Sequence, residues 1–340
     1  QIAAVDGEGA QGRPWGDPVK RLGMTVPFDN VPLGEQRDRF VELEDAGYSD
    51  LWSAEAMGTD AFTPLALASV WTPSMRLGTA IVPAFTRGPA LLAQSVASLA
   101  QAAPGRFTLG LGTSSDVIVE RWNGIDFDRP YHQVRDMVRF LRAAMSGEKV
   151  TTEVNHHQVK GFRLVVLPPE PVPIHIAALR EGMLALAGRE ADGVILNWLA
   201  ATDVPRVTKI VHDAADGAER EVVARLFVAV TEDRDTVMAL GRHAIAAYLN
   251  VPVYRAFHEW LGRGEQLGEM WRLWGEGDRK GALEAIPDSV VDELIIWGSA
   301  GQCREHLGAY VDAGVTTPVV ALLPFGYDER AAARALAVSG

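Results

Sequence analysis

The sequence predicts a (β/α)8 barrel. Short apolar runs of strand length alternate with helical patterns along most of the chain, and about eight such strands can be counted. The 340 residues suffice for one large domain of this kind. An open doubly wound sheet is the rival fold, but the chain lacks the GxGxxG turn with which such sheets bind dinucleotides. We therefore expect a closed parallel barrel with its site at the carboxyl ends of the strands.

The strands and helices are expected in strict alternation. The strands are predicted at residues 22–26, 48–52, 77–82, 107–111, 174–178, 193–197, 222–230 and 315–323. Helical patterns cover residues 33–47, 62–71, 89–102, 131–145, 181–189, 204–215, 235–250 and 301–313. The first helix has Phe40, Leu43 and Ala46 on one face and Gly47 as its stop, and Pro130 opens the fourth.

Three segments depart from this rhythm. Residues 150–171 alternate polar and apolar side chains, which predicts a β-excursion. Residues 251–290 contain tryptophans in helical stretches broken by glycines, which predicts a helical insertion after the seventh strand. These tryptophans fit a wall for a bulky substrate, a small helical core or a dimer face equally well. Residues 1–20 are expected to be an N-terminal arm before a single barrel domain.

Composition limits the partners. The formal net charge of −12 argues against nucleic acid, which requires a basic face. No apolar run approaches the length of a membrane span. The single cysteine, Cys303, excludes an intramolecular disulfide and fits a reducing cytoplasm. We expect a cytoplasmic protein that binds a small molecule. No cluster of Cys and His residues has the spacing of a metal site, so no metal is expected.

The stretch from Gly105 to Gly124 carries the strongest functional signal. Phe107, Leu109 and Leu111 alternate with small residues, as in a strand, and the run then opens into a Gly-Thr-Ser-Ser loop. Small residues let the backbone approach a ligand and leave its N–H groups free. A tight turn without a ligand is the alternative for such a loop on its own.

Residues around this loop resemble the bacterial luciferase-like monooxygenase superfamily, in particular its coenzyme F420-dependent oxidoreductase branch. The resemblance lies in an ordered set of phrases: LGTAI at 77–81, RGP at 87–89, GRFTLGLGTS at 105–114 and VERWNG at 119–124. ILNW at 195–198 is a further phrase of that branch. The resemblance implies a (β/α)8 barrel, a deazaflavin cofactor, a homodimer, and an insertion at 251–290 that caps the barrel mouth.

The resemblance also implies where the cofactor binds. The residues it assigns to the cofactor are Ala80, Ile81, Thr113, Ser114, Ser115, Ala178, Leu179, Arg180 and Asn197. A cis peptide at Ala80-Ile81 is expected behind the ring, the loop hydroxyls near the ring or ribityl chain, and the amide of Asn197 at a cofactor edge. The phosphate is expected at the start of the helix after Arg180, because N–H groups and the helix dipole favour anions there.

Glu55 is the candidate catalytic residue. It follows the second strand, where a carboxylate is placed to handle a proton, although a solvated loop is the commoner place for a lone glutamate. The chain departs from well-known members at three points. Ala56 replaces a histidine, Ser115 replaces a glutamate, and Leu179 with Arg180 replaces glycines.

These observations predict an enzyme that transfers a hydride between coenzyme F420 and an organic substrate. A flavin mononucleotide (FMN)-dependent two-component monooxygenase is the alternative within the superfamily. Because Ala56 and Ser115 replace groups that handle protons, a barrel that binds deazaflavin or another ligand without turnover is the alternative from a different class. A nicotinamide dehydrogenase is less well supported, since its fingerprint is missing.

Overall fold

The computed structural model describes residues 21–155 and 157–337. The arm expected over residues 1–20 therefore lies outside the described residues.

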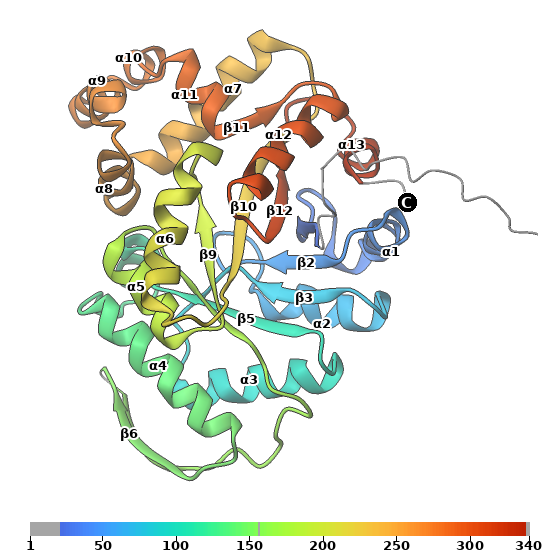
Figure 1. Cartoon of the computed structure of the whole chain (residues 1–340), viewed down its shortest axis with the longest axis vertical. Helices are drawn as coiled ribbons and strands as arrows, with labels where there is room; N and C mark the ends of the chain where they lie inside the picture. Colours follow the sequence, from blue (N-terminus) through green and yellow to red (C-terminus); the bar gives the residue numbers. More distant parts are fainter. Residues whose placement is uncertain (1–20, 156, 338–340) are drawn as a thin grey trace, which may run out of the picture.

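In the described part of the chain, eight parallel strands close into a barrel (Figure 1). They are β1 (Gly23–Thr25), β2 (Asp50–Ser53), β3 (Arg76–Thr79), β5 (Phe107–Gly112), β8 (Ile174–Ala177), β9 (Gly193–Asn197), β10 (Glu221–Ala229) and β12 (Thr317–Leu322). Strand β1 pairs with both β2 and β12, and the pairing of β9 with β10 completes the ring. All eight strands overlap the predicted ranges, so the predicted barrel is confirmed.

Helices follow the strands and surround the barrel (Figure 1). They are α1 (Arg37–Ala46), α2 (Phe62–Trp71), α3 (Pro89–Ala102), α4 (Pro130–Met145), α5 (Glu181–Glu190), α6 (Val204–Ala214), α7 (Arg234–Leu249) and α12 (Ala300–Asp312). Several starts have local causes. Pro89 and Pro130 occupy the first helical position, where a missing N–H costs nothing. Ser299 and Gln302 form a capping box at the start of α12.

The segment after the fourth barrel strand contains a hairpin. Strands β6 (Val150–Val154) and β7 (His157–Phe162) pair antiparallel and lie outside the barrel sheet. In β6, the end residues Val150 and Val154 are buried, whereas the three residues between them are exposed.

Four helices form the insertion after the seventh barrel strand. They are α8 (Pro252–Leu261), α9 (Gly264–Glu276), α10 (Arg279–Glu284) and α11 (Asp288–Leu294). Figure 1 shows them grouped beside α7. Trp271 is buried in this group and donates its indole N–H to the carbonyl of Leu249 over 2.9 Å. Trp271 thus belongs to a helical core, one of the alternatives left open for these tryptophans, whereas Trp260 lies at a pocket described below.

Some elements were not expected from the sequence. They are β4 (Val82–Pro83), the π-helical η2 (Val117–Trp122), β11 (Ile295–Trp297), α13 (Glu329–Leu336) and the short 3-10 turns η1 (Leu33–Glu35) and η3 (Ala201–Asp203). Except for the eight-residue α13, these elements contain only two to six residues, which are too few positions to display a period. The short strands β4 and β11 exist because β5 and β10 offer free edges near their carboxyl ends.

A charged cluster closes the amino-terminal end of the barrel. Arg76 at the start of β3 donates to both carboxylate oxygens of Glu221 over 2.7 and 2.6 Å and also binds Asp50. Glu221 contacts the buried His175 at 3.4 Å. Burial lowers the pKa of His175 to about 4, so its ring is neutral at pH 7. Burial opposes ionisation of Glu221, yet the hydrogen bonds and charge of Arg76 bring its pKa down to about 2.

We expect this cluster to make folding sensitive to acid. Between pH 6.5 and about 4, His175 is protonated in the unfolded chain but neutral in the folded chain. The free energy of unfolding therefore falls as the pH falls through this range. Glu221 adds to this loss between pH 4.5 and about 2. Urea unfolding at several pH values should show that His175→Gln lowers the slope of stability against pH near pH 5 by up to about 1.4 kcal/mol per pH unit. An unchanged slope would contradict the neutral state of His175.

Candidate functional site

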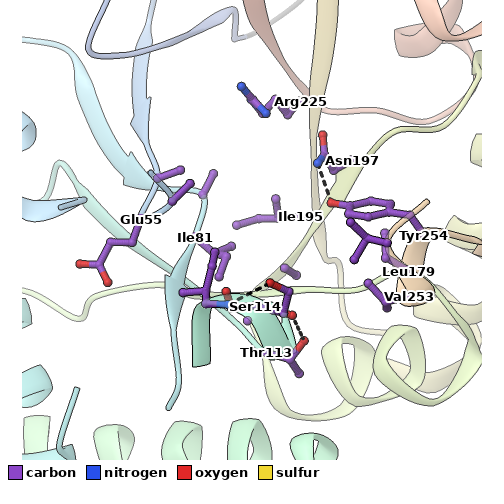
Figure 2. A pocket seen from close by; sticks show the side chains of 18 of the residues that line it. Glu55, Ile81, Thr113, Ser114, Leu179, Ile195, Asn197, Arg225, Val253 and Tyr254 are labelled. Atoms are coloured by element: carbon purple, nitrogen blue, oxygen red, sulfur yellow. Dashed lines mark hydrogen bonds between the residues drawn. The ribbon is translucent and has the colours of Figure 1, made fainter. Parts of the chain in front are cut away.

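A pocket of about 270 Å³ lies at the carboxyl ends of the barrel strands (Figure 2). Its lining comes from the segments after β2, β3, β5 and β8, from β9 and β10, and from α7 and α8 with the turn between them. Nine of the ten residues predicted for the site line this pocket: Glu55, Ala80, Ile81, Thr113, Ser114, Ser115, Ala178, Leu179 and Asn197. Arg180 instead lines an adjoining pocket. Barrel topology therefore brings together residues that are up to 142 positions apart.

The backbone after β3 bends into the pocket. The peptide bond between Ala80 and Ile81 is cis, as the resemblance implied. Ala80 donates its N–H to the carbonyl of Ser53 over 2.6 Å, and the carbonyl of Ile81 accepts from the N–H of Glu55 over 3.1 Å. Because these bonds tie the bend to the end of β2, the side chain of Ile81 has a fixed place in the pocket wall (Figure 2).

The loop after β5 forms the neighbouring wall. Gly112 sits so close to β8 that a Cβ atom there would lie 3.0 Å from the Cβ of Ala177 and 3.1 Å from the Cδ1 of Ile81. Ser114 has a left-handed backbone with φ of 64°. The Ser115 hydroxyl accepts from the N–H of Ile118 over 3.4 Å, at the start of the π-helical turn. Glycine and small polar residues thus leave room beside this loop.

Glu55 lies at the edge of the pocket with its carboxylate bound to Arg87. The Nε atom of Arg87 donates to Oε1 of Glu55 over 3.0 Å, and the N–H of Ala61 reaches the same oxygen over 3.4 Å. Figure 2 shows the carboxylate directed away from Ser114. Asp60 caps α2 by accepting from the N–H groups of its first residues over 2.8 and 3.0 Å. These polar contacts of the Glu55 carboxylate therefore face the surrounding loop rather than the pocket.

The polar side of the pocket lies opposite Glu55 (Figure 2). Asn197, at the end of β9, donates from Nδ2 to the Tyr254 hydroxyl over 2.8 Å. Its Oδ1 atom is buried and has no hydrogen-bond partner among the described residues. Burial raises the pKa of Tyr254 to about 12, against the opposing hydrogen bond from Asn197, so its phenol is neutral at pH 7. The phenol thus keeps a proton that it can donate to a ligand.

Two residues on this side were missed from the sequence. Arg225 on β10 lines the pocket and aligns with Asn197 in the pairing of β9 with β10. A cation within the apolar run VVARLFVAV was the signal that could have identified it. Tyr254 comes from α8 in the insertion, where no pattern distinguishes it from other aromatic residues.

A second pocket of about 380 Å³ adjoins the first one and shares Thr113, Ala177, Leu179 and Val253 with it. It lies at the start of α5, where Arg180 and the first N–H groups of the helix meet Tyr131 and Trp260. The indole N–H of Trp260 reaches Oε1 of Glu181 at 3.4 Å. Free N–H groups and a guanidinium suit an anionic group, although Glu181 places one negative charge beside them.

Between residues 21 and 337, residue 156 excepted, no group of three or more His, Cys, Asp or Glu side chains could hold a metal ion. In the same part of the chain, no helix has both the length and the apolar character needed to cross a membrane.

Comparison with known proteins gave consistent matches. The profile of the family described as luciferase-like monooxygenase matches residues 18–317. A Mycobacterium tuberculosis protein provisionally named a coenzyme F420-dependent oxidoreductase is 30% identical over 335 residues, covering 88% of this chain and 94% of that protein. The 5,10-methylenetetrahydromethanopterin reductase of Methanolobus tindarius is 26% identical over 306 residues, covering 83% and 88%. The solved coenzyme F420-dependent tetrahydromethanopterin reductase of Methanopyrus kandleri has the same fold, with a TM-score of 0.78 at 20% identity, covering 93% of this chain and 97% of that one.

Proposed function

Because the chain belongs to the luciferase-like monooxygenase family, we propose that it is an oxidoreductase that binds coenzyme F420 in the first pocket and exchanges a hydride with a small organic substrate. The observation that carries this proposal is the buried Oδ1 atom of Asn197, which has no partner among the described residues and lies beside the Tyr254 hydroxyl. A buried polar atom of this kind is normally satisfied by a ligand group or an ordered water, and the first pocket provides the space for a ligand. The resemblance inferred from the sequence phrases is confirmed at the level of the family.

The residues present fit a planar heterocycle with polar edges. Ile81 and Ile195 supply apolar surface, and the close approach of Gly112 to Ala177 keeps side chains out of the space beside the loop. Asn197 and Tyr254 offer an acceptor and a donor for ring heteroatoms. When bound, the deazaflavin supplies the carbon centre that accepts or gives the hydride. The protein's part is to orient the ring and keep it against this wall.

The second pocket fits the phosphorylated part of the same cofactor. It continues from the first pocket past Leu179 to Arg180 and the amino end of α5. Arg180 and the first-turn N–H groups would hold the phosphate there, as predicted, despite the loss of the usual glycines. Trp260, whose indole N–H reaches Oε1 of Glu181 at 3.4 Å, would form the outer wall of this pocket.

The next question is which residue of the site donates or accepts a proton. The catalytic role of Glu55 remains a prediction. Its hydrogen bonds with Arg87 and with the N–H of Ala61 indicate that its carboxylate holds the loop after β2 in place. We propose that the neutral phenol of Tyr254 donates a hydrogen bond to the ligand, because its hydroxyl faces the pocket. Because Ala56 and Ser115 replace the histidine and glutamate of well-known members, Tyr254 is a candidate hydrogen-bond donor to the ligand.

Titration of the purified protein with coenzyme F420, and separately with FMN, tests this function. Tryptophan fluorescence and ligand absorbance should show saturable binding of coenzyme F420 and at least tenfold weaker binding of FMN. Tighter binding of FMN would instead favour the monooxygenase alternative. Binding of neither cofactor would refute the proposal. Stable binding of coenzyme F420 without consumption by any substrate would favour a binding protein.

A further inference from the structure

Arg225 places a positive charge at the barrel interior, in a strand whose other residues after Glu221 are apolar. Its neighbours Val223, Ala224 and Leu226 on β10 are buried. The pairing register sets Arg225 beside Asn197 on one side and Val319 on the other. It lines both the first pocket and a small cavity directly beneath it in the barrel, which is also lined by Trp52 and Ile195. The guanidinium thus lies at the floor of the pocket.

This guanidinium has no carboxylate partner within residues 21–155 and 157–337. Its Nε atom is buried without a hydrogen-bond acceptor, and the guanidinium lies over the face of Phe227, with 4.7 Å between the guanidinium carbon and the ring centroid. The acidic side chains that could balance it are engaged elsewhere. Glu55 binds Arg87 at the pocket edge, and Glu221 binds Arg76 at the opposite end of the barrel.

An unbalanced cation in this position is costly. The side chain is half-buried, and its Nε atom is removed from water without an acceptor, which disfavours the folded state in general. The chain carries 12 more acidic than basic residues, yet none of the acidic side chains in the described part of the chain pairs with Arg225. The arrangement makes physical sense where a ligand in the pocket carries the missing negative charge.

Hydride transfer produces such a charge. A hydride consists of one proton and two electrons, so its addition to a neutral ring leaves one negative charge on that ring. The organic donor loses the same hydride and releases a proton as its C–O or C–N bond gains double-bond character. A positive charge near the ring stabilises the reduced form over the oxidised form.

We propose that Arg225 is the counter-ion of the reduced, anionic cofactor ring, so that the protein binds reduced coenzyme F420 more tightly than the oxidised form. This inference rests on the proposed function, since it requires the deazaflavin to occupy the first pocket. It adds a determinant of the cofactor's redox balance that lies on this chain's β10. The Asn197–Tyr254 pair then binds the polar ring edge, while Arg225 balances the charge.

The test compares dissociation constants of the two redox forms. Oxidised and chemically reduced coenzyme F420 are titrated anaerobically into wild-type protein, Arg225→Gln and Arg225→Lys, and the midpoint potential of the bound cofactor is measured by spectroelectrochemistry. Arg272→Gln, which removes an exposed arginine paired with Glu269 and Glu276 on α9, is the matched control for net charge. Circular dichroism confirms folding of each variant.

Wild-type protein should prefer the reduced form at least tenfold. Arg225→Gln should lose that preference, which for a two-electron couple lowers the bound midpoint potential by about 30 mV. Arg225→Lys should retain most of it, and Arg272→Gln all of it. Equal affinity of wild-type protein for both forms overturns the inference without any variant, as does an unchanged preference in folded Arg225→Gln. If wild-type protein binds neither form, the proposed function itself fails.

Discussion

Gly110→Val is expected to destabilise the protein by at least about 3 kcal/mol, at the upper end of overpacking effects. A Cβ atom at Gly110 would lie only 1.8 Å from the carbonyl oxygen of Thr79 and 2.5 Å from the Cδ1 of Ile195. Backbone cannot rotate away as a side chain can. The Thr79 hydroxyl also binds both the N–H and the C=O of Gly110, over 2.8 and 2.9 Å. Strands β3 and β5 must therefore separate to admit any larger residue.

Urea unfolding followed by circular dichroism measures this loss. Gly268→Ala on α9 is the matched control, because a Cβ atom there meets nothing within 4 Å. That exchange should stabilise the protein by roughly 0.5–1 kcal/mol, since it reduces the backbone freedom of the unfolded chain within a helix. A Gly110→Val protein with wild-type stability would show that β3 and β5 do not approach as closely as described.

The strand order of the barrel was readable from the sequence because its signal is local. Each barrel strand is a short run, mostly apolar, between turn residues. In β5, Phe107, Leu109 and Leu111 alternate with small residues, and every residue of the strand is buried. The bounds of α2 and α3 agree with their predicted ranges for the same reason. Closure followed from counting strands, since eight parallel strands are the number that closes a barrel of this kind.

The floor of the site was not readable because its partners are distant in sequence. Tyr254 meets Asn197 across 57 residues, through a helix of the insertion whose path no pattern predicts. Arg87 meets Glu55 across 32 residues, and this contact turns the predicted catalytic carboxylate toward the loop. Arg225 was hidden because the direction of a side chain in a strand depends on how the barrel closes. By contrast, the cofactor residues at strand ends were predictable, because topology alone gathers strand ends.

Ser114→Trp is expected to weaken cofactor binding at least a hundredfold. Ser114 follows β5 and faces the space between Ile81 and the Asn197–Tyr254 pair (Figure 2). An indole has nearly the size of two fused rings of the proposed ligand, and a pocket of about 270 Å³ cannot hold both. The neighbouring walls cannot yield readily, because Gly112 already lies against Ala177.

The measurement is the fluorescence titration with coenzyme F420, with Ser289→Trp as the matched control. Ser289 is exposed on α11, outside the residues that line either pocket, so that variant adds the same indole without filling the site. Ser114 has a left-handed backbone, in which a bulky residue is strained, so circular dichroism must first show that Ser114→Trp folds. In the folded variant we expect the added volume of the indole to lower the affinity. Wild-type affinity in that variant would place the cofactor outside the first pocket, and with it the roles proposed for Asn197 and Tyr254.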